Sequence, residues 1–188
     1  MDYSKLGLVK QRQEPLREQY RITPEAARIT NGAGSVQNGR SDPFHSTVAP
    51  GQGHDVLWQI GVHRAVGGDH DLPNPCDMLC AALASCLDST LRMIADRLEI
   101  PVIFLAVTTQ AEVDVRGTLL VDRNVPVGSQ QMKCQIHLET SPDIPQEKMK
   151  MLLAAAEHSC VVLQTLRHGV PVHMQFDKFQ PTAALAAR

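Results

Sequence analysis

The segment from Asp77 to about Leu98 constrains the fold of this chain more than any other part of the sequence. Asn74 or a neighbouring residue is placed to cap a helix here, and Pro75 suits its first turn. The charged side chains of the segment lie mainly in its second half, so the first half is almost uncharged on every side. A mainly apolar stripe recurs at intervals of three or four residues, at Leu79, Leu83, Cys86, Thr90 and Met93. We therefore predict a long helix that is buried on several sides.

Alternation of apolar and polar residues predicts strands before and after this helix. The clearest strands lie at 105–115 and 132–138, and each has one apolar face. Residues 56–62 alternate as well, and the apolar phase continues to Arg64, which would then point toward the core. Because a buried charge needs a partner, Arg64 is a candidate for an inward-facing cation. The alternative is a surface charge on an edge strand.

The last part of the chain predicts two helices and a closing strand. The first helix begins near Pro145 and breaks near Ser159, and the second runs from Cys160 to His168. Alternation at 170–176 then predicts the last strand. Strands, a helix, two strands, two helices and a strand in this order indicate the α+β class with an antiparallel sheet.

Composition limits the domain count, the partners and the location. A chain of 188 residues is expected to form one domain with extensions, namely an arm at 1–25, a domain at 26–180 and a tail at 181–188. The net charge of −2 argues against nucleic-acid binding. No uninterrupted apolar run approaches the ~18 residues of a membrane span, and the N-terminus lacks the apolar region of a secretory signal. We expect a cytoplasmic protein with no nucleic-acid or membrane partner.

Two of the five cysteines, Cys86 and Cys160, lie in apolar helical contexts 74 residues apart. In a reducing compartment cysteines rest as thiols, and a disulfide is transient and functional rather than structural. The odd number of cysteines also leaves no complete pairing scheme. The pair therefore indicates reversible redox chemistry, whereas the alternative is that both residues are small buried hydrophobes.

The segments around these cysteines resemble the OsmC/Ohr family, which includes thiol-dependent peroxidases. In that family a Pro, an acidic residue and Leu-rich and Ala-rich positions precede a Cys in a long central helix, and a second Cys begins a later helix. The matching positions here are Pro75, Asp77, Leu79, Ala81, Ala82, Leu83 and Cys86, and later Cys160-Val161-Val162. Asp77 stands where Glu is common, and Val161 replaces the usual Pro. The resemblance covers roughly residues 30–176. It implies an OsmC-like fold in which antiparallel sheets wrap long central helices in an intertwined homodimer.

The resemblance also implies a reaction. Cys86 would attack an organic hydroperoxide as a thiolate, and Cys160 would resolve the sulfenic acid as a Cys86–Cys160 disulfide. A dithiol reductant would recycle the pair, and no cofactor is required. The thiolate needs a nearby cation, because Cys86 lies about nine residues inside its helix and the helix dipole acts mainly within the first turn. Arg64 fits by its strand phase, and Arg40 resembles the early-loop arginine of the organic-hydroperoxide-resistance branch.

Helix geometry limits the role of Asp77. Nine helical residues place Asp77 about 13 Å from Cys86 along the axis and near 180° around it. If Asp77 orients the arginine beside Cys86, it does so from a second subunit across a two-fold interface. Its alternative role is that of a first-turn acid that complements the helix dipole. Cys160, in contrast, follows the expected cap Ser159. Its thiol is therefore expected to interact directly with the free backbone N–H groups at the start of that helix.

Three other interpretations remain open at this point. The chain could be a non-enzymatic OsmC-like dimer whose cavity binds an apolar ligand. Cys76 and Cys80 lie one helical turn apart and, with His70 or His54, would make a metal or thiol-sensing site, although the spacing is not that of a zinc finger. Cys134 lies in the apolar phase of a strand, where core packing explains it.

Overall fold

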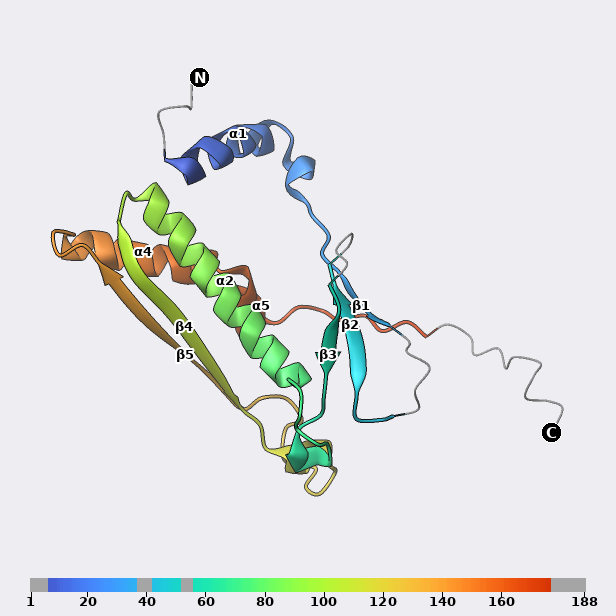
Figure 1. Cartoon of the computed structure of the whole chain (residues 1–188). Coiled ribbons are helices and arrows are strands. Elements are labelled where there is room, and N and C mark those ends of the chain that lie inside the picture. The colour runs from blue at the N-terminus through green and yellow to red at the C-terminus, as the bar shows by residue number, and fades with distance from the viewer. Residues whose placement is uncertain (1–6, 37–41, 52–55, 177–188) are drawn as a thin grey trace, which may run out of the picture.

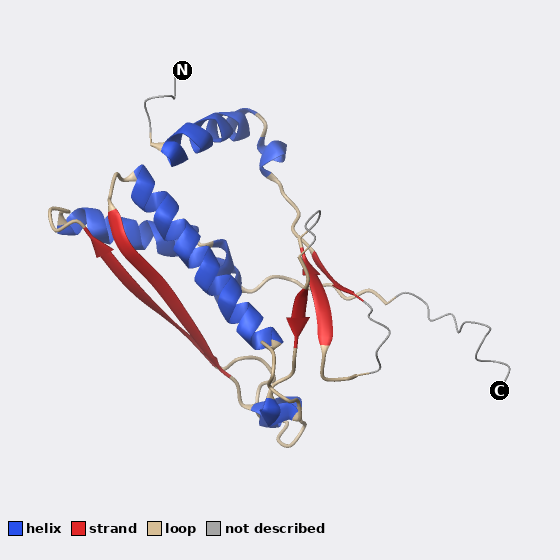
Figure 2. Ribbon diagram, viewed as in Figure 1, coloured by secondary structure: helices blue, strands red, loops and turns tan. Residues whose placement is uncertain are grey.

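The structure is a computed structural model that describes residues 7–36, 42–51 and 56–176. Its helices are α1 (Leu8–Ile22), α2 (Pro75–Arg97), α3 (Val115–Thr118), α4 (Gln146–Ser159) and α5 (Val161–His168), with short 3-10 helices η1 (Pro24–Ala27) and η2 (Arg64–Val66). Its strands are β1 (Ala33–Val36), β2 (Ser46–Pro50), β3 (Trp58–Ile60), β4 (Val102–Glu112) and β5 (Gln131–Thr140). The predicted α+β class is confirmed (Figure 2).

Two separate antiparallel sheets flank the long helix α2. One sheet has the order β1-β2-β3, and the other is the pair β4-β5. Figure 1 shows β4 and β5 running alongside α2, with the three-stranded sheet on the other side of the helix. The extensive packing of α2 is with β4, α4 and α5, and the three-stranded sheet takes no part in it. One face of α2 is therefore left open by the described residues.

The β4-β5 ladder turns one apolar face toward α2. Its register pairs Leu105 with Leu138, Val107 with Ile136 and Thr109 with Cys134. Directly opposed residues of an antiparallel pair project to the same face, so these pairs form one surface. The largest buried cluster joins this surface to α2 and α4, and it contains Leu91, Ala95, Ile100, Leu105, Leu152 and Ala156. The alternation predicted for both strands is confirmed, although β4 ends at Glu112 rather than near Val115.

The helix α2 matches its predicted extent, but its buried stripe is rotated. The buried positions are Leu83, Leu87, Thr90, Leu91 and Ala95. Leu79 and Met93, which were expected to face inward, are 38% and 39% exposed. The buried positions centre on Leu87 and Leu91, so Leu79 and Met93 lie toward the edge of the buried face.

α2 is also the one helix among the described residues that is long and apolar enough to cross a membrane. Its packing against β4, α4 and α5 identifies it instead as the core helix of the fold. The expectation that no apolar stretch approaches the length of a membrane span was therefore too strict. The Ala-rich and Leu-rich composition reflects burial in protein.

The described part of the N-terminal arm contains a helix that docks on the C-terminal end of α2 (Figure 1). The Val9 N–H, one of the free amides of the first turn of α1, donates to Asp96 Oδ2 at 2.9 Å. Two ion pairs reinforce this contact, Arg97 with Glu14 at 2.8 Å and Lys10 with Glu99 at 3.1 Å. α1 buries none of its own residues fully, so polar contacts hold it in place.

The predicted last strand is wrong: the structure has no strand at 170–176. Residues 170–176 have no strand partner, and Val170, Val172, Met174 and Phe176 are all exposed. The alternation of apolar residues is real, but a strand forms only where another strand offers its backbone N–H and C=O groups. Figure 1 shows this segment leaving α5 toward the three-stranded sheet.

Candidate functional site

The fold brings Cys86 and Cys160 together. Cys86 lies on α2, and Cys160 lies at the junction of α4 and α5. Both side chains belong to a second apolar cluster, together with the buried Leu83 and Leu87. Cys86 packs against the buried cluster that contains Cys160, and its proximity contributes to a raised pKa of the Cys160 thiol. Residues 74 positions apart in the sequence therefore form one dithiol, in which both sulfurs are free thiols.

The two thiols differ in their environments. Cys160 is completely buried, whereas Cys86 is half-buried. Burial raises the pKa of the Cys160 thiol above its ordinary value of 9.0, while backbone N–H groups of Leu163 and Val162 pull it down and Cys86 raises it further. The predicted interaction of Cys160 with free helix amides is thus present, but burial outweighs it. The cap of α5 is Cys160 itself and not Ser159.

Asp77 completes a capping box at the start of α2. Asn74 Oδ1 accepts hydrogen bonds from the N–H groups of Cys76 and Asp77, at 2.8 and 3.2 Å. Asp77 Oδ2 accepts in return from the Asn74 N–H at 2.9 Å. The carboxylate therefore has a structural task within its own chain. Asp77 is nevertheless exposed, and it lines a small cleft of ≈ 480 Å³ with Cys76 and Cys80.

Arg64 does not point into the core. The strand β3 ends at Ile60, and Arg64 begins the 3-10 helix η2, where it is exposed. The predicted inward phase was wrong because the alternation stops at Gly61. A Cβ at Gly61 would meet the Leu72 backbone oxygen at 3.2 Å, so this position favours glycine. The other candidate, Arg40, lies outside the described residues.

A larger apolar cleft adjoins the dithiol cluster. It has a volume of ≈ 770 Å³, and its walls come from α2, β5, α4 and α5. Leu83 and Leu87 belong both to these walls and to the cluster around Cys160. Among the described residues, neither Cys86 nor Cys160 lines the cleft itself. Cys134 does, and the pKa of its thiol is raised by burial and by Cys80 and lowered by Arg167.

The structure places an ion pair at this cleft that the sequence did not predict. Arg167 of α5 bonds to Glu157 of α4 at 2.7 Å, and both residues line the cleft. The two residues are ten positions apart and lie on different helices. The i, i+4 spacing that predicts ion pairs within one helix is therefore absent. The charge of Arg167 lowers the pKa of the Cys134 thiol.

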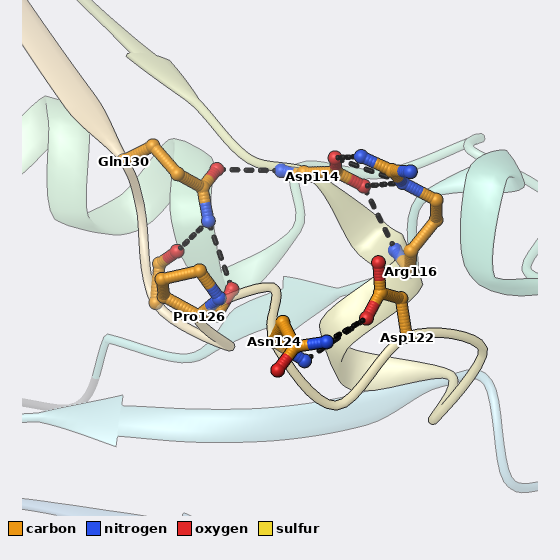
Figure 3. A network of polar contacts seen from close by, with 7 residues as sticks. Asp114, Arg116, Asp122, Asn124, Pro126 and Gln130 are labelled. Atoms are coloured by element: carbon orange, nitrogen blue, oxygen red, sulfur yellow. Dashed lines mark hydrogen bonds and ion pairs between the residues drawn. The ribbon is translucent and has the colours of Figure 1, made fainter.

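The loop between β4 and β5 contributes Ser129 and Gln130 to the cleft wall. Figure 3 shows the polar contacts that Gln130 makes within this loop. Gln130 Oε1 accepts from the Asp114 N–H at 2.6 Å, and Gln130 Nε2 donates to the carbonyls of Pro126 and Gly128 at 2.9 and 2.7 Å. Asp114 also binds Arg116 by an ion pair. These bonds hold Gln130 in the cleft wall.

The described residues contain no cluster of three or more His, Cys, Asp or Glu side chains arranged to hold a metal ion. Cys76 and Cys80 line the small cleft without His70. His54, the other histidine considered for such a site, lies outside the described residues.

The structure is that of an α+β protein in which a cysteine of the long central helix α2 packs beside a cysteine at the start of α5. The sequence profile of the family described as OsmC-like protein matches residues 68–175, which is more than half of the chain. The chain belongs to the OsmC-like protein family, and the resemblance inferred from the cysteine segments is confirmed.

Solved structures show the same fold. An OsmC-like protein from Mycoplasma pneumoniae aligns with a TM-score of 0.58 at 13% identity, covering 75% of this chain and 89% of the other. Organic hydroperoxide resistance proteins from Legionella pneumophila and Elizabethkingia anophelis both align with a TM-score of 0.54. Their identities are 18% and 19%, with 76% of this chain and 92% and 91% of theirs covered. At these identities the likeness shows the fold. No curated protein matches the chain in sequence.

Proposed function

We propose that this protein is a thiol peroxidase that reduces organic hydroperoxides. The observation that carries the proposal is the packing of Cys86 against the buried cluster that contains Cys160. The Cys86 thiolate attacks the O–O bond, releases an alcohol and becomes a sulfenic acid. The Cys160 thiol then condenses with it, which releases water and forms the disulfide. A dithiol reductant returns both sulfurs to thiols. With five free thiols, such a chain suits the reducing cytoplasm.

The environments of the two thiols support this division of roles. An attacking thiol must be reached by the peroxide, and Cys86 is the more accessible of the pair. Cys160 is buried with a raised pKa, so it remains a protonated thiol until the sulfenic acid forms beside it. Membership of the OsmC-like family supports the same chemistry, since hydroperoxide resistance proteins share this fold.

The site in this proposal belongs to a homodimer. α2 exposes a stripe of small, uncharged residues on its open face, namely Ala82, Ser85 and Ser89. The apolar residues at 170–176 are likewise left exposed by the described part of the chain. A second copy would cover both surfaces. Asp77 of one subunit then orients an arginine beside Cys86 of the other, and Arg64 and Arg40 are the candidates for that arginine.

The test is to add one equivalent of cumene hydroperoxide to the reduced protein. Within the first seconds, two thiols per chain should be lost, and mass spectrometry after alkylation should map a Cys86–Cys160 disulfide. Cys86→Ser should abolish the reaction, and Cys160→Ser should allow one oxidation without cycling. Cys76→Ser, a matched control on the exposed turn of α2, should still form the Cys86–Cys160 disulfide. Unchanged thiols in the wild-type protein would exclude the peroxidase.

A second candidate is a non-enzymatic dimer that binds an apolar ligand. The cleft of ≈ 770 Å³ favours it, because that cleft is lined mainly by apolar side chains and, among the described residues, by neither redox thiol. This candidate predicts that an apolar probe such as a fatty acid binds equally well to the wild-type protein and to Cys86→Ser. Binding together with unchanged thiols under peroxide would select this candidate.

A further inference from the structure

A histidine at the start of the three-stranded sheet lies between two carboxylates. His45 directly precedes β2, and its side chain is 27% exposed. Its Nδ1 lies 2.6 Å from Asp42 Oδ2, and its Nε2 lies 3.1 Å from Asp71 Oδ1 and 3.2 Å from Asp71 Oδ2. An ionised carboxylate only accepts hydrogen bonds, so the ring donates to both partners only when both of its nitrogens carry a proton. The arrangement therefore fits the imidazolium form of His45.

The two carboxylates belong to different parts of the chain. Asp42 lies in the turn before β2, where its Oδ1 also accepts from the Phe44 N–H at 2.8 Å. Asp71 lies 26 positions from His45, in the connecting loop (61–73) that joins β3 to the start of α2. We call His45 with these two carboxylates the histidine clamp. The clamp joins the sheet to the loop that leads into the central helix.

A second contact holds the same connecting loop beside the sheet. A Cβ at Gly67 would lie 3.8 Å from the Phe44 ring, so this ring packs beside the glycine. Gly67 directly follows η2, and its N–H donates to the Arg64 carbonyl at 3.0 Å. Phe44 and His45 therefore contact the connecting loop close to Arg64, one by apolar packing and the other by charge.

Backbone hydrogen bonds close the connecting loop at its base. The Gly61 N–H donates to the Pro73 carbonyl at 3.0 Å, and the His70 N–H donates to the Val62 carbonyl at 3.1 Å. The three-stranded sheet takes no part in the extensive packing of α2, so α2 does not fix the sheet in place. A loop that is closed at its base can tilt as one body. Its contacts with Phe44 and with the histidine clamp therefore decide where Arg64 lies.

We propose that His45 is a pH-sensitive positioning residue, whose imidazolium holds the connecting loop so that Arg64 is placed for the peroxidase site. The inference rests on the proposed function, in which Arg64 is one of two candidate arginines. When the imidazolium loses a proton to solvent, one ring nitrogen presents a lone pair in place of an N–H. One carboxylate of the clamp then has no donor from the ring, and the connecting loop is released from the sheet.

The charges around His45 give the direction of the switch. Hydrogen bonds to Asp42 and to Asp71 raise the pKa of His45 above its ordinary value of 6.5. The same interaction lowers the pKa of Asp71. The stability contributed by the clamp is therefore fully present below pH 6.5 and is lost as the pH rises through the folded-state pKa of His45. His63 and His70 of the connecting loop face each other, with ring centroids 4.3 Å apart, and their titration needs a control.

The first test measures hydrogen exchange on the full-length reduced protein. Spectra are taken from about pH 5.5 to about pH 9, a range that brackets the histidine pKa. After correction for the intrinsic exchange rate, protection of the connecting loop should fall about two- to fivefold as the pH rises, the size expected for a surface ion pair. His45→Gln should show the lower protection throughout the range.

Two variants separate the clamp from other causes of pH dependence. His45→Arg keeps a permanent cation with several donors, so protection of the connecting loop should stay high across the range. His70→Asn removes the neighbouring titratable ring, and Asn tolerates the left-handed backbone of residue 70, where φ is 57°. Protection in this variant should keep the pH dependence of the wild-type protein.

The second test compares peroxide turnover in His45→Gln and the wild-type protein at the same pH. Taking the ratio cancels the titration of Cys86, which both proteins share. The variant should be about two- to fivefold slower at about pH 5.5, where the wild-type clamp is closed, and equally fast at about pH 9.

The outcomes separate this inference from the proposed function. Loop protection that does not change with pH, or that changes equally in His45→Gln, would overturn the clamp. A pH-dependent loop with a constant turnover ratio would overturn the positioning of Arg64 and leave the peroxidase intact. No peroxide turnover in the wild-type protein, together with a pH-dependent loop, would refute the proposed function and retain the clamp. Because the wild-type protein carries the main readout, a poorly folded variant does not decide the result.

Discussion

The Asp77 side chain has a structural role and a proposed catalytic role, and substitutions at Asp77 and Asn74 can distinguish the two. In its own chain it closes the capping box of α2, and in the proposed dimer it orients an arginine beside the partner's Cys86. Asn74 shares the first task and has no part in the second. We therefore compare Asp77→Asn, Asp77→Ala and Asn74→Ala.

The structure sets the expected stability changes. Asn74→Ala removes the acceptor of two backbone N–H groups, and loss of such a cap costs about 1 kcal/mol. Asp77→Ala removes the acceptor of the Asn74 N–H and a favourable charge at the helix start, together also about 1 kcal/mol. Asp77→Asn keeps an acceptor and loses only the charge, about 0.5 kcal/mol. Urea unfolding at one fixed protein concentration measures all three.

Activity should follow a different order. If the Asp77 carboxylate positions the arginine, Asp77→Asn should lower peroxide turnover by about 10²-fold despite its small effect on stability. Asn74→Ala should keep peroxide turnover close to that of the wild-type protein. Equal loss of turnover in Asn74→Ala and Asp77→Asn would refute the catalytic assignment and leave Asp77 as a helix cap.

Three further predictions concern the fold. Leu152 of α4 is fully buried in the cluster that it shares with Leu91 and Ala95 of α2. Leu152→Ala should lower the free energy of unfolding by about 3–4 kcal/mol, measured by urea unfolding, and a loss below about 1 kcal/mol would contradict the described core. Asp96→Ala removes the acceptor of the Val9 N–H and should speed hydrogen exchange across α1 while the exchange of β4 stays unchanged. The raised pKa of Cys160 means that the folded state holds this proton more tightly than the unfolded chain, so the stability it contributes is fully present below pH 9.0 and is lost as the pH rises through the folded-state pKa. Cys160→Ala should flatten the decline of stability above pH 9.0, and an unchanged decline would contradict the shift.

Local patterns predicted the elements that depend on local interactions. The cap at Asn74, Pro75 in the first turn and the uncharged body placed α2 within two residues of its observed ends. The two-residue alternation identified the inward faces of β4 and β5. Both patterns reflect how a helix or strand buries one side, and this can be read without knowing the neighbour.

Predictions that needed a neighbour were less successful. Arg64 was assigned to a strand because its phase continued, yet the strand ends at Ile60 where the chain packs closely at Gly61. Residues 170–176 carry a strand pattern, but a strand forms only when a second strand supplies hydrogen-bond partners. The stripe of α2 was displaced because the position of β4 decides which side of the helix is covered.

The sequence by itself determined the family, the central helix and the two cysteines that frame the proposed chemistry. Only the tertiary structure decided that Cys86 packs beside Cys160 and that Arg64 lies at the surface. The physical reason is the separation in sequence over which each kind of interaction acts. Capping and side-chain periodicity act within a few residues, whereas the packing of two cysteines 74 residues apart depends on how α2, α5 and the β4-β5 sheet pack around one core.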